Sequence, residues 1–279
     1  MRLTRAAAPR LRPFIRSFWV SDRTSSQAPL TSRRENVLPT GDMHLVFRLS
    51  DDPVRLFTPD TASPELFAGH AVVGGPRAAY YTKDITKPAL AVGVQLKAGA
   101  AEALFCASAD EFAGRHVGLT DLWGRSATLA RDRILEARNP EGQLDVLETI
   151  LSERLPEIRA MHPAVAGALE YFGTSFSICE AVRRSGYSHR GFVALFRRTV
   201  GLAPKAYTRV LRFQRVLSQC AKGDVRGAAS WVDLAMRAGY SDQSHFIREF
   251  REFAGVTPEY YRRVAPEASH HVVTDLPSS

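Results

Sequence analysis

The side chains best suited to bind a partner are the basic residues in the carboxyl-terminal part of the sequence. Arginine and lysine form charge-assisted hydrogen bonds with phosphate oxygens, and such contacts fix a protein on a nucleic acid without selecting a base sequence. If about 6–10 phosphates are engaged, affinity should fall about 10³–10⁵-fold between 50 and 200 mM salt. The candidates for phosphate contact are Arg197, Arg198, Lys205, Arg209, Arg212 and Arg251.

The excess positive charge of the chain lies in the same region. Residues 164–263 contain 16 Lys and Arg against 8 Asp and Glu, whereas the other residues contain 21 of each, so this region accounts for the net charge of +8. This distribution is typical of a nucleic-acid-binding half. A membrane is a poorer partner, because no apolar run approaches the ~20 residues that a span needs. Residues 1–13 lack the apolar core of a secretory signal, and the three scattered cysteines suit a reducing compartment, so we expect a cytoplasmic protein.

One sequence pattern occurs twice within this region, in residues 181–207 and in residues 235–261. In both copies a Phe-Arg pair is followed four residues later by Gly, then at intervals of three by Pro and Tyr. Two equivalent segments at this separation predict two equivalent structural units.

Each copy has the residue types of two helices joined by a tight turn. Gly186 and Gly239 fall where a helix stops and the chain must turn, which glycine permits at positive φ. Ser188 and Ser241 stand where an N-cap would begin the next helix. Phenylalanines then form an inward stripe at helical spacing and leave a polar, basic face exposed. This is the pattern of a helix-turn-helix unit, whose exposed face would enter a DNA major groove.

A helix from about Lys205 to Ala221, with Pro204 in its first turn and Gly223 beyond its end, would join the two units. At about 1.5 Å per residue it spans about 25 Å, which can hold two reading helices near one DNA turn, about 34 Å, apart. One chain could then read two adjacent major grooves without a dimer.

The amino-terminal half has a different pattern. Residues 1–97 read as strands and turns, which favours an antiparallel sandwich or small barrel, and residues 98–155 read as helices. In the last of these helices Leu144, Leu147 and Leu151 form an amphipathic stripe. The stripe suits either a dimer seam or a face within the domain, and we favour the seam.

These patterns predict an α+β chain in three parts. Residues 1–158 would form a β-rich, sandwich- or barrel-like sensor or dimerisation domain with attached helices. Residues 162–265 would form an all-α DNA-binding domain of two helix-turn-helix units joined by a long helix, with reading helices at about Ser188–Thr199 and Asp242–Phe253. Residues 266–279 would be a disordered tail.

Residues 164–263 resemble the DNA-binding domain of the AraC/XylS family of bacterial transcription regulators over its whole length. The second copy is close to the family signature, through Ala235-x3-Gly239-Tyr240-Ser241 and the Phe-Arg, Gly, Pro and Tyr positions that follow. The amino-terminal half is similar to a sensor domain found in some such regulators, through residues 37–42, 92–96 and 119–124.

The resemblance implies base-reading positions early on the second helix of each unit. Arginine there suits guanine O6 and N7 and glutamine suits adenine, whereas valine and alanine offer only apolar contact. We therefore expect the second unit to contribute at least as much polar readout as the first. The positions are Arg190, Val193 and Ala194 in the first unit and Gln243, Ser244, His245 and Arg248 in the second.

A candidate effector pocket consists of Phe18, Trp19, His44 and Phe47, since sensor pockets are concave and mostly apolar. Equally, the aromatic residues could be ordinary core. No metal site, cofactor or catalytic residue is expected, because the sequence has no Cys/His cluster at zinc spacing, no phosphate-binding glycine loop and no nucleophile motif.

We expect a sequence-specific transcription regulator that binds double-stranded DNA and responds to a small effector in its amino-terminal domain. RNA polymerase and a second copy of the chain are further candidate partners. One alternative is a ligand-independent architectural DNA binder, which would show similar affinity for unrelated sequences. The other is an enzyme-like amino-terminal domain fused to a DNA-binding module, which a buried cluster of ionisable side chains would favour.

Overall fold

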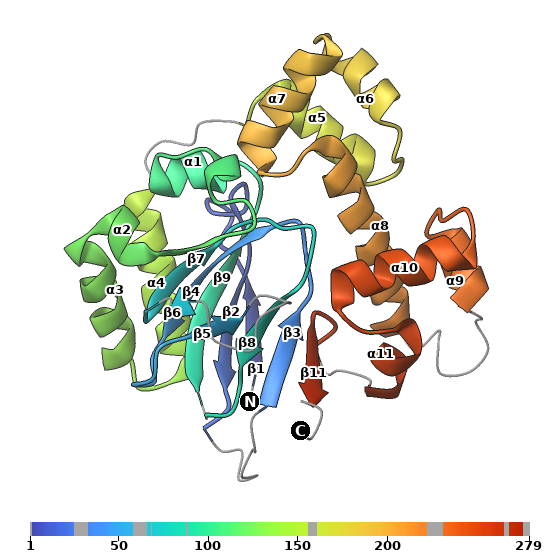
Figure 1. Cartoon of the computed structure of the whole chain (residues 1–279). Helices are drawn as coiled ribbons and strands as arrows, with labels where there is room; N and C mark the ends of the chain where they lie inside the picture. Colours follow the sequence, from blue (N-terminus) through green and yellow to red (C-terminus); the bar gives the residue numbers. More distant parts are fainter. Residues whose placement is uncertain are drawn as a thin grey trace.

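The computed structural model describes residues 2–24, 33–57, 66–67, 69–87, 89–155, 161–221, 231–264 and 268–275. Its first layer is a six-stranded antiparallel sheet in the order β1-β2-β9-β4-β7-β10 (Figure 1). The strands are β1 Arg2–Ala6, β2 Ile15–Asp22, β4 Met43–Arg48, β7 Ala71–Gly74, β9 Leu90–Leu96 and β10 His116–Gly118.

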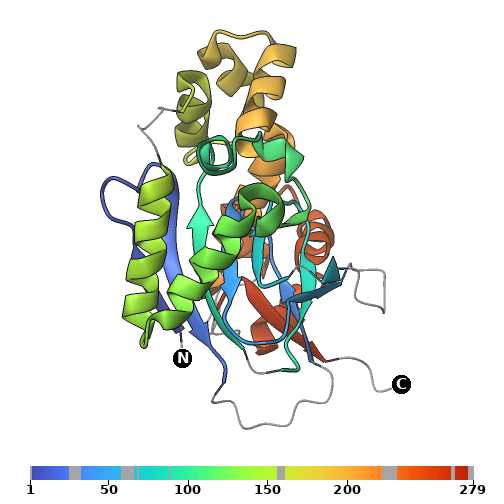
Figure 2. The same ribbon diagram turned by 90° about the vertical axis from the view of Figure 1, so that its left-hand side faces the viewer.

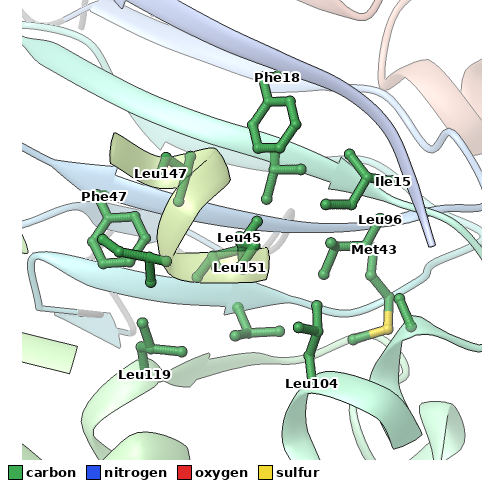
Figure 3. Packing of buried hydrophobic residues seen from close by; sticks show 14 of the residues in the cluster. Ile15, Phe18, Met43, Leu45, Phe47, Leu96, Leu104, Leu119, Leu147 and Leu151 are labelled. Carbon is green, nitrogen blue, oxygen red and sulfur yellow. The ribbon is translucent and has the colours of Figure 1, made fainter. Parts of the chain in front are cut away.

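Helices cover one face of this sheet, and the main hydrophobic core lies between the two (Figures 2 and 3). Residues alternate along a strand between the two faces, so Met43, Leu45 and Phe47 of β4 all point into this core. Because β10 pairs with β7, it interrupts the region of residues 98–155 that the sequence pattern assigned to helices. The helical elements are α1 Ala100–Phe105, the 3₁₀ turn η1 Ala109–Glu111, α2 Leu119–Trp123, α3 Arg125–Glu136 and α4 Pro140–Arg154.

The leucine stripe of α4 belongs to this core. Leu144, Leu147 and Leu151 are each 0% exposed, and Figure 3 shows Leu147 and Leu151 against the sheet residues Phe18 and Leu45. The prediction of a dimer seam is therefore wrong. The same apolar spacing serves a helix that packs on its own sheet, and periodicity alone does not distinguish the two uses.

The second layer is a five-stranded antiparallel sheet in the order β11-β3-β8-β5-β6. Its outermost strand, β11, comes from the far end of the chain and pairs with β3 so that His271 lies opposite Val37. The prediction of a disordered tail is wrong for this strand, because β3 offers an unpaired edge and Val272 is 0% exposed among residues of the helical domain. The strands are β3 Arg33–Val37, β5 Arg55–Phe57, β6 Leu66–Phe67, β8 Tyr81–Asp84 and β11 His271–Asp275.

The rest of the described chain is helical and has two cores of its own. One contains Phe172, Phe192 and Phe196, and the other contains Phe213 and Phe250. The long helix α8 runs from the first core to the second (Figure 1). The helices are α5 Pro163–Phe172, α6 Ile178–Ser185, α7 His189–Val200, α8 Pro204–Ala221, α9 Trp231–Arg237, α10 Gln243–Ala254 and α11 Pro258–Val264. The predicted stop of α8 at Gly223 and part of the predicted domain boundary lie outside the described residues.

Hydrogen bonds join the helical domain to the amino-terminal domain. The Asn36 side-chain amide donates to the Ala254 carbonyl oxygen at 3.1 Å, and the Gly99 backbone N–H donates to the Thr199 carbonyl oxygen at 3.2 Å.

The predicted α+β class and the two-part architecture are confirmed. Among the helices that the structure describes, none has the length and apolar character required to cross a bilayer.

Candidate nucleic-acid interface

The first unit consists of α6, a glycine turn and α7. Gly186 ends α6 with a φ of +73°, as its position in the repeat predicts, and Ser188 caps α7 by accepting a hydrogen bond from the Gly191 N–H at 3.2 Å. Phe192 and Phe196 are 0% exposed and hold α7 on its core. The opposite face of α7 therefore points outward.

The candidate base-reading residues of this unit lie on that outward face. Arg190 and Ala194 are exposed, and Val193 is half-buried. All three line a shallow hollow with Arg197 and with Asp110, which belongs to η1 of the amino-terminal domain. The Asp110 carboxylate lies 4.0 Å from the Arg197 guanidinium, so a negative charge stands beside the first reading helix. Nothing in the sequence pattern pointed to Asp110.

The second unit repeats this construction with one difference. Gly239 has a φ of +86° after α9, but the cap of α10 is Asp242, which accepts from the His245 N–H at 2.7 Å. The predicted cap Ser241 is wrong by one position. The second copy has one extra residue between the turn and its first buried phenylalanine, and Asp242 is also a favoured capping residue.

The reading face of α10 is more polar than that of α7. Gln243, Ser244 and Arg248 are exposed, whereas His245 is half-buried and lies 3.3 Å from the carboxylate of Glu249. His245 also contacts the ring of Tyr240, so its side chain has partners inside the unit. The exposed polar set of the second unit is therefore Gln243, Ser244 and Arg248.

The six phosphate-contact candidates fall into two groups. Arg197, Arg198, Lys205 and Arg251 are exposed. Arg209 is half-buried and forms ion pairs with Glu249 at 3.2 Å and with Glu252 at 2.5 Å. Arg212 donates to the Gly239 carbonyl oxygen at 3.3 Å and lies over the Tyr240 ring. These two arginines fasten α8 to the second unit.

A buried carboxylate, which sequence reasoning missed, organises the same junction. Glu249 is 2% exposed and accepts from Arg209 of α8 and from the Tyr240 hydroxyl at 3.3 Å. Burial and the neighbouring Glu249 charge raise the pKa of Tyr240, so the phenol stays a donor. Because a buried charge needs partners, this cluster fixes the direction in which α10 leaves α8. Its only sequence signal was a charged residue at an inward helical position.

The structure separates the four candidate effector residues. Phe18 and Phe47 are 0% exposed on the helix-covered face of the first sheet, in the main core. Trp19 and His44 lie on the other face, toward the second sheet, and each rests over a glycine. A Cβ on Gly93 would lie 2.3 Å from the Trp19 ring, and a Cβ on Gly74 would lie 2.1 Å from His44 Nε2. One pocket cannot contain all four, because neighbouring strand positions face opposite sides.

Two family models match the sequence. Residues 181–264 match a helix-turn-helix domain, and residues 4–118 match a domain of unknown function (DUF6597). No curated protein matches the chain.

Several solved structures are similar at low identity. A structure of ToxT from Vibrio cholerae is 11% identical over 88% of this chain and 98% of its own, with a TM-score of 0.43. Another, with an unsaturated fatty acid bound, is 10% identical over 94% of each chain, with a TM-score of 0.45. The carboxyl-terminal domain of AraT, a response regulator from Geobacillus stearothermophilus, is 20% identical over 38% of this chain and 88% of its own, with a TM-score of 0.33.

Two capped helix-turn-helix units with exposed polar and basic faces define a DNA-binding transcription regulator. The helical domain is a helix-turn-helix domain of the AraC type, and the β-rich half carries the domain of unknown function.

Proposed function

We propose that one copy of this regulator reads two adjacent major grooves of double-stranded DNA and that a small effector bound between its two sheets changes how well it does so. The observation that carries the proposal is a pair of reading helices, each held on its own core with its polar face outward. The 18-residue helix α8 joins them, and at about 1.5 Å per residue such a helix spans about 27 Å.

The proposed roles follow from the side chains at the surface. Arg190 of α7 and Arg248 of α10 would read guanine, and Gln243 would read adenine. The exposed Arg198 and Arg251, near the other ends of these helices, would contact phosphates. Residues 1–158 would be the sensor and residues 162–265 the DNA-binding domain, with Trp19 and His44 on the effector side of the first sheet.

A cluster of ionisable side chains between the sheets is the feature that an enzyme-like domain would need, but its histidines suit binding better than proton transfer. A general base needs a pKa near the working pH. Burial, followed by the nearby Arg77 charge, lowers the pKa of His44 to about 3 and that of His116 to about 2. Both rings are neutral at pH 7 and too weakly basic for that role. We therefore assign the cluster to ligand binding.

A binding-site selection from random duplex DNA tests the reading roles. Arg190→Ala and Arg248→Ala should each relax the preference at one position by about 1–3 kcal/mol, in different halves of the site. Arg198→Ala should weaken binding to all sequences alike and reduce the salt slope by about 1. Arg133→Ala, which removes an exposed arginine from α3 of the sensor, is the matched control and should change neither.

Two outcomes would contradict this proposal. Equal affinity for unrelated sequences would identify an architectural binder instead. A much larger relaxation from Arg190→Ala than from Arg248→Ala would refute the expectation that the second unit supplies at least as much polar readout as the first.

A further inference from the structure

The space between the two sheets has an unusual lining. When two sheets pack face to face, the side chains between them normally form an apolar core. Here the large apolar core lies on the opposite face of the first sheet, and the side chains of β4 and β8 that face each other are half-buried. The space between these two strands is therefore lined largely by polar groups. Its lining includes His44, Val46 and Arg48 of β4 and Tyr81 and Lys83 of β8.

Four polar side chains meet at one end of this space. The Tyr81 hydroxyl lies 3.5 Å from His44 Nε2, across the gap between the sheets. The ring of Tyr81 stands edge-on to His116, with centroids 4.6 Å apart, and the Arg77 guanidinium lies 4.3 Å above the same ring. The His44 and His116 ring centroids are 5.8 Å apart. One β8 side chain thus gathers a guanidinium and two imidazoles.

Two hydrogen-bond donors in this cluster lack an acceptor. A terminal nitrogen of Arg77 lies 3.2 Å from His116 Nδ1 and can only donate, so Nδ1 accepts and the proton of the neutral ring is on Nε2. His116 Nε2 and Arg77 Nε are both buried without a hydrogen-bond partner among the described residues. Buried donors are costly to leave unpaired. Each of these two nitrogens therefore needs a hydrogen-bond acceptor.

The cluster also has a positive charge without a carboxylate beside it. The described partners of Arg77 are the Arg115 carbonyl oxygen, His116 and the Tyr81 ring. The buried carboxylate of Glu35 is already engaged by three basic groups. Lys83 and Arg23 each lie 2.7 Å from it, and His271 Nδ1 lies 2.6 Å away. Glu35 therefore has little capacity left to neutralise Arg77.

The electrostatic potential at the imidazoles agrees with this picture. The pKa of His44 is lowered to about 3, by burial first and by surrounding positive charges second. The groups among them that are charged at pH 7 are Arg77 and Lys83, because burial lowers the pKa of His271. An anion placed among these groups would meet a favourable field from several sides.

We propose that Arg77, His116, His44 and Tyr81 bind the carboxylate of a small organic acid between the two sheets. A carboxylate supplies acceptors for both orphaned donors and a negative charge for the guanidinium, which no neutral ligand does. The body of the ligand would be apolar and short, because Tyr81 also borders a small apolar cluster of Leu56, Val72 and Val54. The inference rests on the proposed function, since it names the class of effector for the proposed sensor.

Calorimetric titration of the purified full-length protein with acetate, benzoate and hexanoate tests the site. Benzamide serves as the neutral analogue and inorganic phosphate as the non-organic anion. We expect benzoate or hexanoate to bind, and benzamide and phosphate to bind at least about tenfold more weakly. Arg77→Gln should lower carboxylate affinity by about tenfold or more, whereas Arg115→Gln, at the exposed side chain next to His116, should not.

Folding and binding can be separated. Arg77→Gln should melt no lower than the wild type without ligand, because it removes a buried charge that has no carboxylate partner. If that variant is nevertheless poorly folded, Tyr81→Phe removes only a hydroxyl and should still weaken benzoate binding severalfold. The proposal is overturned if none of the three carboxylates binds, if benzamide binds as well as benzoate, or if neither variant weakens binding.

Failure of this inference can be told apart from failure of the proposed function. DNA binding by the ligand-free protein is measured separately and should be the same for wild type and Arg77→Gln. Carboxylate binding that leaves DNA affinity unchanged would support the site and refute its role as an effector site. A normal DNA selection with no carboxylate binding would refute the site alone.

Discussion

Individual buried histidines make stability depend on pH. His44, His116 and His270 are neutral when folded, because burial lowers their pKa values to about 3, 2 and 4. In the unfolded chain an imidazole takes up a proton near pH 6.5. Below that pH the unfolded state therefore binds more protons than the folded state, and acid favours unfolding.

The first prediction concerns His44→Gln. The free energy of unfolding of the wild type should fall as pH drops from about 6.5 to 5, by up to about 1.4 kcal/mol per pH unit for each such histidine. The variant should lose one histidine's share of that slope. Urea unfolding at pH 8 and pH 5 measures it, above the range in which carboxylates such as Glu35 take up protons. The pH 8 difference reports packing alone, so an unchanged difference at pH 5 would contradict the idea.

For individual residues, the sequence predicts which side chains lie on the surface of a helix better than which face of a sheet a strand residue occupies. Helical spacing correctly placed Phe192 and Phe246 inside, and Arg190 and Arg248 are exposed opposite them. The predicted effector pocket combined Phe18 with Trp19, although neighbouring positions of a strand lie on opposite faces of the sheet. Both residues are apolar, so composition could not say which face is the core.

Helices α7 and α10 meet the amino-terminal domain at the second glycine of each repeat. Gly201 and Gly255 end α7 and α10 with φ values of +87° and +70°. Both also touch the amino-terminal domain. A Cβ on Gly201 would lie 2.3 Å from Pro76, and one on Gly255 would lie 2.5 Å from Tyr80. These two helix ends are therefore contact points between the domains.

A pair of alanine substitutions tests this role. Gly239→Ala should cost about 1–2 kcal/mol from positive φ alone, because its nearest neighbour would be 3.8 Å from the new Cβ. Gly255→Ala carries the same strain and adds a clash with Tyr80 and Asn36, so it should cost about 1–3 kcal/mol more. Urea unfolding of the two proteins gives the comparison. Equal costs would show that the docking of α10 on the amino-terminal domain contributes little to stability.

The sequence could predict that these glycines end helices, but not what they touch. Helix ends are set locally, by a residue that tolerates positive φ. The partners of Gly201 and Gly255 lie in the amino-terminal domain, more than 90 residues away, and no local pattern marks them. The N-cap of α10 shows the same limit at short range. Ser241 and Asp242 are both favoured capping residues, and the structure uses Asp242.

At the scale of the whole molecule, the last strand, β11, contacts both domains. β11 extends the second sheet at β3, Val272 is buried among residues of the helical domain, and the Tyr260 hydroxyl donates to the Val273 carbonyl oxygen at 3.2 Å. The two-domain plan was predictable from charge and periodicity. This strand was not, because five residues in a polar segment become a strand only when a free edge is available.

Placing a charge on β11 tests its role as a connector. Val272→Asp puts a carboxylate at a position that is 0% exposed, which should cost about 2 kcal/mol or more and free the helical domain from the second sheet. Small-angle scattering should then show a larger radius of gyration. Thr274→Asp adds the same charge to a half-buried position of the same strand and should change the radius less. Identical scattering from both variants and the wild type would rule out the connecting role.

Because β11 follows every helix that the structure describes, the ribosome makes this edge strand of the second sheet after all of them. His271 of that strand is one of the three basic partners of Glu35, so this buried carboxylate lacks one partner until the helical domain has been synthesised. The amino-terminal domain therefore cannot complete its second sheet on its own during translation, and a nascent chain acquires the whole sheet only after its helical domain has been synthesised.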